Sequence, residues 1–108
     1  TDGRLRWVLE DIFALHADWL SGQNLVISNP PYVPQSERAE IAPHVLGYEP
    51  EAALFVPDDE PLVFYKQISR LAQGWLGSGG WLLFEAHTHY APALASWLSG
   101  QGWGEVSL

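Results

Sequence analysis

A short apolar run that is closed by two prolines constrains the fold of this chain more than any other feature. Residues 24–28 read Asn-Leu-Val-Ile-Ser, and Asn29-Pro30-Pro31-Tyr32 follows directly. Continuous apolar runs of this length are typical of strands that are buried in a parallel sheet. Proline has no backbone N–H for a sheet ladder, so the strand must end at Pro30. The pattern therefore predicts a buried strand that runs into a polar and aromatic loop.

The rest of the chain predicts an α/β fold with a mainly parallel sheet, because strand-like and helical patterns alternate. Acidic residues before Pro61 indicate a helix start, and the glycine-rich run at 77–80 indicates its end. The expected strands are 4–10, 24–28, 81–85 and 103–108, the expected helices are 61–76 and 91–98, residues 11–20 form a loop or short turn, and residues 33–57 are mostly irregular. Helical spacing in the first helix predicts a buried face of Phe64, Ile68, Leu71 and Trp75, with Leu62, Tyr65 and Leu76.

The composition favours one packed domain and disfavours several other classes. The chain has 108 residues, 47% of them hydrophobic, and no apolar run approaches the ~20 residues that cross a bilayer. No signal-peptide pattern opens the chain, and the absence of cysteine excludes disulfides and thiolate metal sites. Thirteen acidic residues face five basic ones, so a basic nucleic-acid-binding face is not expected. His87 and His89 are too few for a zinc site, so no metal is expected.

The residues after the predicted strand have a specific chemical use. A planar amide-type nitrogen is a weak nucleophile, because its lone pair is delocalised, so it must be held in line for attack. The side-chain oxygen of Asn29 and the backbone carbonyl of Pro30 can each accept one N–H of such a group. The proline ring fixes the direction of that carbonyl, and Tyr32 offers a ring face to a flat substrate. Alternatively, the two prolines only end the strand and Asn29 caps a turn.

The segment NLVISNPPY at 24–32 resembles the motif-bearing strand of amino-methyltransferases. That group includes enzymes acting on adenine N6, on guanine N2 and on the glutamine of release factors. Residues farther along favour the last of these: Val33-Pro34, Val45, Tyr48-Glu49-Pro50, Ala53-Leu54, Leu62, Phe64-Tyr65, Ile68, Gly79-Gly80-Trp81-Leu82-Leu83 and Glu85. Over nearly its whole length, the chain resembles the release-factor N5-glutamine methyltransferase family.

The resemblance implies a fold, a reaction and a set of site residues. The fold is Rossmann-like, of class I methyltransferases, and residues 1–108 are its second half, without the glycine-rich cofactor loop. The reaction is S-adenosylmethionine-dependent methylation of the glutamine amide in the Gly-Gly-Gln loop of peptide chain release factors. It takes place in the cytoplasm, without direct contact to nucleic acid or membrane. The implied residues are Asn29 and Pro30 for catalysis, Asn29, Pro30, Pro31, Tyr32 and Glu49 for the substrate, and Asp11, Ile12, Phe13 and Asn29 for the cofactor.

Other interpretations stay open at the level of the sequence. A nucleic-acid amino-methyltransferase would have to flip a base toward Tyr32, and a non-catalytic fragment would only dock a partner. Asp11 can instead be a helix N-cap or a solvated acid, and Glu49 can be a solvated loop carboxylate. The family usually has glycine at the position of Pro61 and a glycine-containing turn at 86–89. We expect the chain alone to be inactive, to bind S-adenosylmethionine weakly or not at all, and to cover its open sheet edge by self-association or with a partner.

Overall fold

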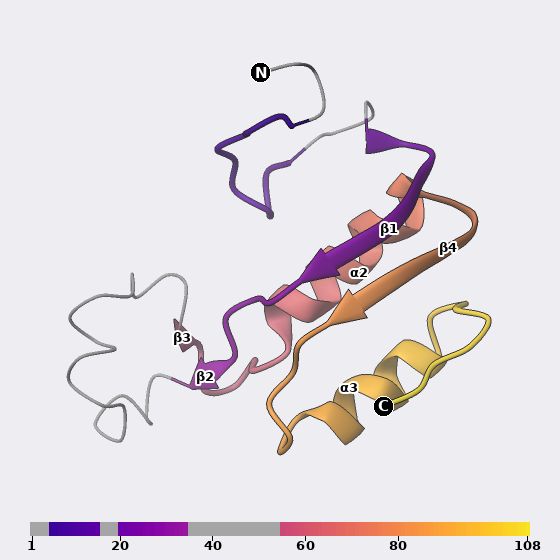
Figure 1. Cartoon of the computed structure of the whole chain (residues 1–108). Coiled ribbons are helices and arrows are strands. Elements are labelled where there is room, and N and C mark those ends of the chain that lie inside the picture. Colours follow the sequence, from indigo (N-terminus) through magenta and orange to yellow (C-terminus); the bar gives the residue numbers. More distant parts are fainter. Residues whose placement is uncertain (1–4, 16–19, 35–54) are drawn as a thin grey trace.

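The protein is an α/β structure built on a small parallel sheet (Figure 1). The computed structural model describes residues 5–15, 20–34 and 55–108. The elements follow in the order β1 (Gln23–Ser28), β2 (Val33–Pro34), β3 (Phe55–Val56), α2 (Val63–Trp75), β4 (Leu76–Phe84) and α3 (Ala91–Ser99). The predicted α/β class is confirmed, since both pairs of strands are parallel and helices alternate with them.

The strand predicted at 24–28 forms β1, and it pairs in parallel with β4. The ladder continues past both strands, because the N–H of Glu85 donates to the carbonyl of Ser28 at 3.1 Å. The chain connects the two strands through α2, as parallel pairing requires a crossover. The carboxyl ends of both strands therefore lie side by side, and Asn29 leaves the sheet at this end.

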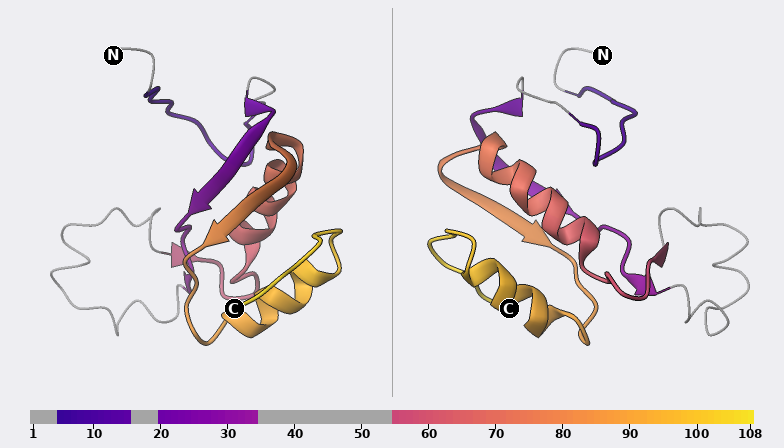
Figure 2. Two further views of the ribbon diagram at one scale, coloured as in Figure 1. Left: turned by 45° about the vertical axis from the view of Figure 1, so that its right-hand side comes forward. Right: turned by 180° about the vertical axis from the view of Figure 1, so that it is seen from behind.

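α2 covers one face of this strand pair (Figure 2). Its buried residues are Tyr65, Ile68, Ser69 and Ala72, which recur at helical spacing. The predicted buried face is wrong for Phe64, Leu71 and Trp75, which are only half-buried. Apolar residues lie on more than one side of this helix, so the contact with the sheet, and not the pattern, selects the buried side.

α2 begins at Val63, two residues later than predicted. The carbonyl of Glu60 accepts the N–H of Val63 at 3.2 Å, so residues 60–63 form a β-turn with Pro61 in its second position. No acidic residue lies in the first helical turn. The predicted helix start at Pro61 is therefore wrong by two residues, because Pro61 is equally suited to a β-turn.

The glycine run at 77–80 lies inside a strand, and the prediction that it ends the helix and precedes the strand is wrong. α2 ends at Trp75 and β4 begins at once with Leu76. The pairing register shifts within this part of the strand, so the glycines form a bulge. Gly79 has a φ of +78°, and a Cβ on Gly80 would lie 3.0 Å from the carbonyl oxygen of Gly77. Glycine is the residue that tolerates both conditions.

The second predicted helix is α3, and it packs beside α2. Pro92 lies at its start and Gly100 follows its end, as the sequence predicts. The ring of Trp97 lies with its centroid 5.5 Å from Lys66 Nζ and 5.5 Å from Arg70 Cζ, both on α2. These cation–π contacts join the exposed sides of the two helices.

The predicted strand at 103–108 is wrong, since this segment has no strand structure. Its first residue, Trp103, donates its indole N–H to the hydroxyl of Ser69 at 3.2 Å. This bond satisfies the buried hydroxyl on α2 and directs the segment toward the helix. A strand needs hydrogen bonds to a neighbouring strand, and this segment pairs with none of the described strands.

The face of the sheet opposite α2 is exposed. In the β1–β4 register Leu25 lies opposite Trp81 and Ile27 opposite Leu83, and all four side chains point to this face. Their exposed fractions are 47% to 70%. The prediction of a fully buried β1 is therefore wrong for this side, because no described segment covers it. An apolar patch of this kind is unusual on a monomer surface.

The predicted first strand is also wrong, because residues 5–10 have no strand structure. Their side chains are exposed, including the large apolar Leu9 and Trp7. Among the described strands β1 pairs only with β4, and residues 5–10 do not add to its other edge. The apolar pattern of residues 5–9 is suited to a strand but cannot form one alone.

The segment predicted to be irregular begins and ends with paired residues. β2 and β3 pair in parallel, with Val33 opposite Phe55, and both residues of β3 are buried. Residues 35–54, including the helical turn expected near 36–41 and the matches at Val45 and Tyr48, lie outside the described residues. In the described part of the chain, no helix combines the length and the apolar character that a membrane span requires.

Candidate functional site

The four residues after β1 lie at the carboxyl end of the parallel strands β1 and β4. Asn29 is exposed, Pro30 is buried, and Pro31 and Tyr32 are half-buried. The ring of Tyr32 lies 5.8 Å from the ring of His87, which follows β4. Ligand sites of open α/β sheets are found at this carboxyl edge. The sequence motif is thus in the position that favours binding.

Tyr65 on α2 contacts the end of β4 next to this motif. Its side chain is fully buried, and its hydroxyl donates to the carbonyl of Glu85 at 2.8 Å. Its ring meets that of Phe84 edge-to-face, with centroids 5.0 Å apart. Tyr65 therefore fixes the end of β4, and Glu85 in turn bonds to the end of β1.

Burial raises the pKa of Tyr65 from 10.0 to about 12, with smaller contributions from Tyr32 and from the carboxylate of Glu85. The folded protein thus holds this proton more tightly than the unfolded chain does. Its contribution to stability is complete below pH 10 and is lost as the pH rises toward 12.

We expect alkaline pH to destabilise the protein through this single phenol. Between pH 10 and 12 the free energy of unfolding should fall by about 2–3 kcal/mol more in the wild type than in Tyr65→Phe. Urea denaturation at several pH values measures this difference. Parallel pH profiles for the two proteins would contradict the assignment, since the other titrating groups are common to both.

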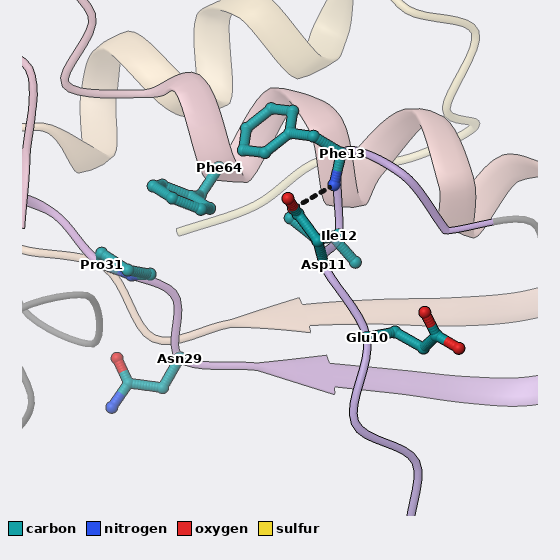
Figure 3. A pocket seen from close by; sticks show the side chains of 7 residues that line it. All are labelled: Glu10, Asp11, Ile12, Phe13, Asn29, Pro31 and Phe64. Carbon is teal, nitrogen blue, oxygen red and sulfur yellow. Dashed lines mark hydrogen bonds between the residues drawn. The ribbon is translucent and has the colours of Figure 1, made fainter.

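A pocket of about 570 Å³ opens beside the motif (Figure 3). Three parts of the chain line it: residues 10–13, then Asn29 and Pro31 after β1, and Phe64 at the start of α2. Its walls are mainly apolar, and Asp11 and Asn29 provide polar groups. Such a combination is typical of sites for small organic ligands.

The turn that carries Asp11 is fixed by its own hydrogen bonds. Asp11 Oδ1 accepts the backbone N–H of Phe13 at 2.9 Å, and the Asp11 carbonyl accepts that of Ala14 at 2.9 Å. The prediction of a loop or short turn at 11–20 is confirmed for residues 11–15, while residues 16–19 lie outside the described residues. No described helix directly follows Asp11, so its bond to Phe13 closes a turn and is not a helix N-cap. The bond uses one carboxylate oxygen, while a carboxylate has about four acceptor positions in all.

Two residues on α2 hold this turn, and the sequence did not point to either as part of a site. The rings of Phe13 and Phe64 meet at a centroid distance of 5.2 Å and an angle of 63°. Gln67 Nε2 donates to the carbonyl of Ile12 at 3.2 Å. Phe64 was predicted to be a core residue from its helical spacing, and Gln67 carries no motif that marks it.

The structure brings together some of the predicted site residues and separates others. All four residues predicted for the cofactor, Asp11, Ile12, Phe13 and Asn29, line this pocket, together with Pro31 of the predicted substrate residues. In Figure 3 the Asn29 amide points away from the Asp11 turn. Pro30 and Tyr32 do not line this pocket, and Glu49 lies outside the described residues.

The histidines near the motif are arranged by local contacts. His87 Nδ1 accepts the backbone N–H of His89 at 3.0 Å. The ring of His87 also lies 5.9 Å from that of Tyr90. Over residues 5–15, 20–34 and 55–108, no group of three or more His, Asp or Glu side chains could hold a metal ion.

Comparison with curated proteins gives consistent matches. The release factor glutamine methyltransferase of Bacteroides thetaiotaomicron is 42% identical over 91 residues, which are 82% of this chain and 32% of the relative. The protein of the same name from Chlorobaculum tepidum is 36% identical over 107 residues, 97% of this chain and 35% of the relative. That from Flavobacterium psychrophilum is 46% identical over 66 residues, 61% of this chain and 23% of the relative.

The chain belongs to the release factor glutamine methyltransferase family. It spans about a third of the length of the Bacteroides thetaiotaomicron and Chlorobaculum tepidum members and about a quarter of the Flavobacterium psychrophilum member. No protein-family profile matches the chain. No solved structure matches it either.

Proposed function

We propose that this chain is part of an S-adenosylmethionine-dependent enzyme of class I, Rossmann-like fold. The enzyme methylates the glutamine amide in the Gly-Gly-Gln loop of peptide chain release factors. The observation that carries the proposal is the place of Asn29. This residue opens the substrate motif at the carboxyl end of β1, and it lines one pocket together with the Asp11 turn. One residue thus borders both the proposed substrate and the proposed cofactor.

The substrate side of the site would work by orientation. The Asn29 side-chain oxygen and the Pro30 carbonyl accept the two N–H groups of the glutamine amide, which points the nitrogen at the methyl group. Pro31 and Tyr32 line the path of the flat amide, and Glu49 contributes to the substrate pocket. The amide nitrogen can release its proton after it has been alkylated, so no strong general base is required.

The residues of the pocket fit the adenine part of S-adenosylmethionine, which when bound supplies an electrophilic methyl group. Asp11 has acceptor capacity beyond its bond to Phe13, and an adenine amino group is a donor. Ile12 and Phe13 provide apolar and aromatic surface for a flat ring, and both line the pocket. Asn29 closes the side of the pocket nearest the substrate motif.

The protein substrate follows from the names of the relatives and from the charge of the chain. The relatives are release factor glutamine methyltransferases. A net charge of −8 gives no support for direct binding to nucleic acid. We therefore propose a release factor as partner, a cytoplasmic location, and no contact with a membrane.

A chimera tests the activity. In it this chain replaces the aligned 107-residue segment of the Chlorobaculum tepidum relative, an alignment that covers 97% of the chain. With labelled S-adenosylmethionine, we expect methyl transfer to a release factor and none to an adenine- or guanine-containing oligonucleotide. Transfer to the oligonucleotide alone would favour the nucleic-acid activity. A folded chimera that transfers to neither, beside an active relative, would favour a non-catalytic fragment.

We propose that the 108-residue chain alone binds S-adenosylmethionine weakly and is inactive. Its pocket is open, and the exposed fraction of the Phe13 ring is 49%, so a bound adenine would stay in contact with water. Isothermal titration calorimetry of the isolated chain checks this. Micromolar affinity would refute the proposal.

We also expect the isolated chain to self-associate through the apolar sheet face of Leu25, Ile27, Trp81 and Leu83. Parallel sheets are nearly always covered on both faces. In a pure sample, the same face of a second copy is the apolar surface that can cover this one. Ile27→Lys should shift sedimentation toward the monomer. Asn24→Lys adds the same charge at an exposed polar position of β1 and should leave association unchanged. A monomeric wild type at high concentration would contradict the expectation.

A further inference from the structure

We propose that Gln67 is a positioning residue for purine binding, and that Phe64 completes the purine-binding wall from α2. The inference rests on the proposed cofactor role of the Asp11 turn and extends it to a second element of the fold. Residues 11–13 do not form the purine side of the site by themselves. α2 holds them in place and adds one wall.

The hydrogen bond of Gln67 is the link between α2 and the turn. Gln67 Nε2 donates to the carbonyl of Ile12 at 3.2 Å, across 55 positions of sequence. Ile12 lies between Asp11 and Phe13, so this bond fixes the centre of the turn. Within the turn, Asp11 Oδ1 orients Phe13 through its N–H. Fixing Ile12 therefore sets the direction of both the carboxylate and the ring.

The Phe13–Phe64 contact supplies the wall. The two rings meet edge-to-face with centroids 5.2 Å apart, and both line the pocket. In Figure 3 the Phe13 ring lies above the Asp11 carboxylate and the Phe64 ring lies to its left. A flat aromatic ligand can lie against this pair while its amino group reaches the carboxylate. Adenine has both properties, so a purine that carries an exocyclic amine is the ligand class that fits.

The other residues of the turn give it little support. The exposed fraction of Phe13 is 49%, and residues 5–11 are all exposed. Segments with few buried contacts open easily. The Gln67 hydrogen bond and the Phe64 ring join this turn to α2, so the loss of either contact should weaken ligand binding.

NMR titration of the 108-residue chain with adenosine tests the proposal, because it measures millimolar affinities. We expect saturable shifts at the amides of Phe13 and Phe64. Gln67→Glu keeps the shape but removes the donor, and it should weaken adenosine binding by about two- to tenfold. Gln67→Lys restores a donor and should recover part of the affinity. The Phe13 amide should exchange faster with solvent in Gln67→Glu than in the wild type.

Gln73→Glu is the matched control. Gln73 is a second glutamine of α2, and its Nε2 also donates to a backbone carbonyl, that of Gln101, away from the pocket. This variant should leave adenosine affinity and Phe13 exchange unchanged. Equal loss of affinity in both variants, wild-type affinity in Gln67→Glu, or no saturable shift in the wild type would each overturn the proposal. Methyl transfer by the chimera is measured separately, so either result can fail without the other.

Discussion

Asn29→Ala should lower kcat/KM for methyl transfer to a release factor by about 100-fold or more in the chimera. Alanine removes the side-chain oxygen that is proposed to orient the glutamine amide. The backbone carbonyl of Pro30 remains, but one acceptor leaves the amide free to rotate. Because orientation acts on the reacting geometry, we expect kcat to fall more than KM rises.

Asn24→Ala is the control for this experiment. Asn24 lies on β1, the strand that Asn29 follows, is exposed, and does not line the pocket. It should retain nearly full activity. If Asn29→Ala keeps kcat within a few-fold of the parent chimera, the orienting role of Asn29 is wrong, whatever the identity of the substrate.

Tyr65→Ala should cost about 3–5 kcal/mol of stability, the usual range when a large buried aromatic side chain is truncated. Tyr65 is fully buried, contacts Phe84, and holds the end of β4 through the Glu85 carbonyl. A loss of this size is a large part of the total stability of a small domain. Urea denaturation measures it, and absence of a cooperative transition would also meet the expectation.

Two further variants separate the contributions of Tyr65. Tyr65→Phe keeps the ring and removes only the hydroxyl, so it should cost about 1 kcal/mol. Trp7→Ala removes a ring whose exposed fraction is 84%, and it should change stability by less than about 0.5 kcal/mol. Equal losses of unfolding free energy for Tyr65→Ala and Trp7→Ala would contradict the expectation that the buried Tyr65 contributes far more to stability than the exposed Trp7.

Local patterns located several elements from the sequence. The apolar run ended by Pro30 correctly predicted β1, and Pro92 with Gly100 correctly predicted α3. The pattern around Asp11 correctly predicted a turn. In each case the deciding interaction is local: a missing N–H, a helix terminus, or a side chain bonded two residues ahead.

Strand pairing and burial could not be predicted in the same way. The patterns at 5–10 and 103–108 suit strands, yet neither segment pairs, because a strand exists only with a neighbour. The glycines at 77–80 looked like a helix stop but form a bulge within β4. Ser69 is buried because the distant Trp103 satisfies its hydroxyl.

The sequence by itself determined the family and the place of the Asn29-Pro30-Pro31-Tyr32 motif at a strand end, because both depend on residue identity and on short spacings. Only the tertiary structure decided that the motif and the Asp11 turn border one pocket, and that Phe64 and Gln67 hold that turn. These contacts join residues more than fifty positions apart along the chain. They depend on how α2 packs on β1 and β4, which the periodicity of its sequence left open among several sides of the helix.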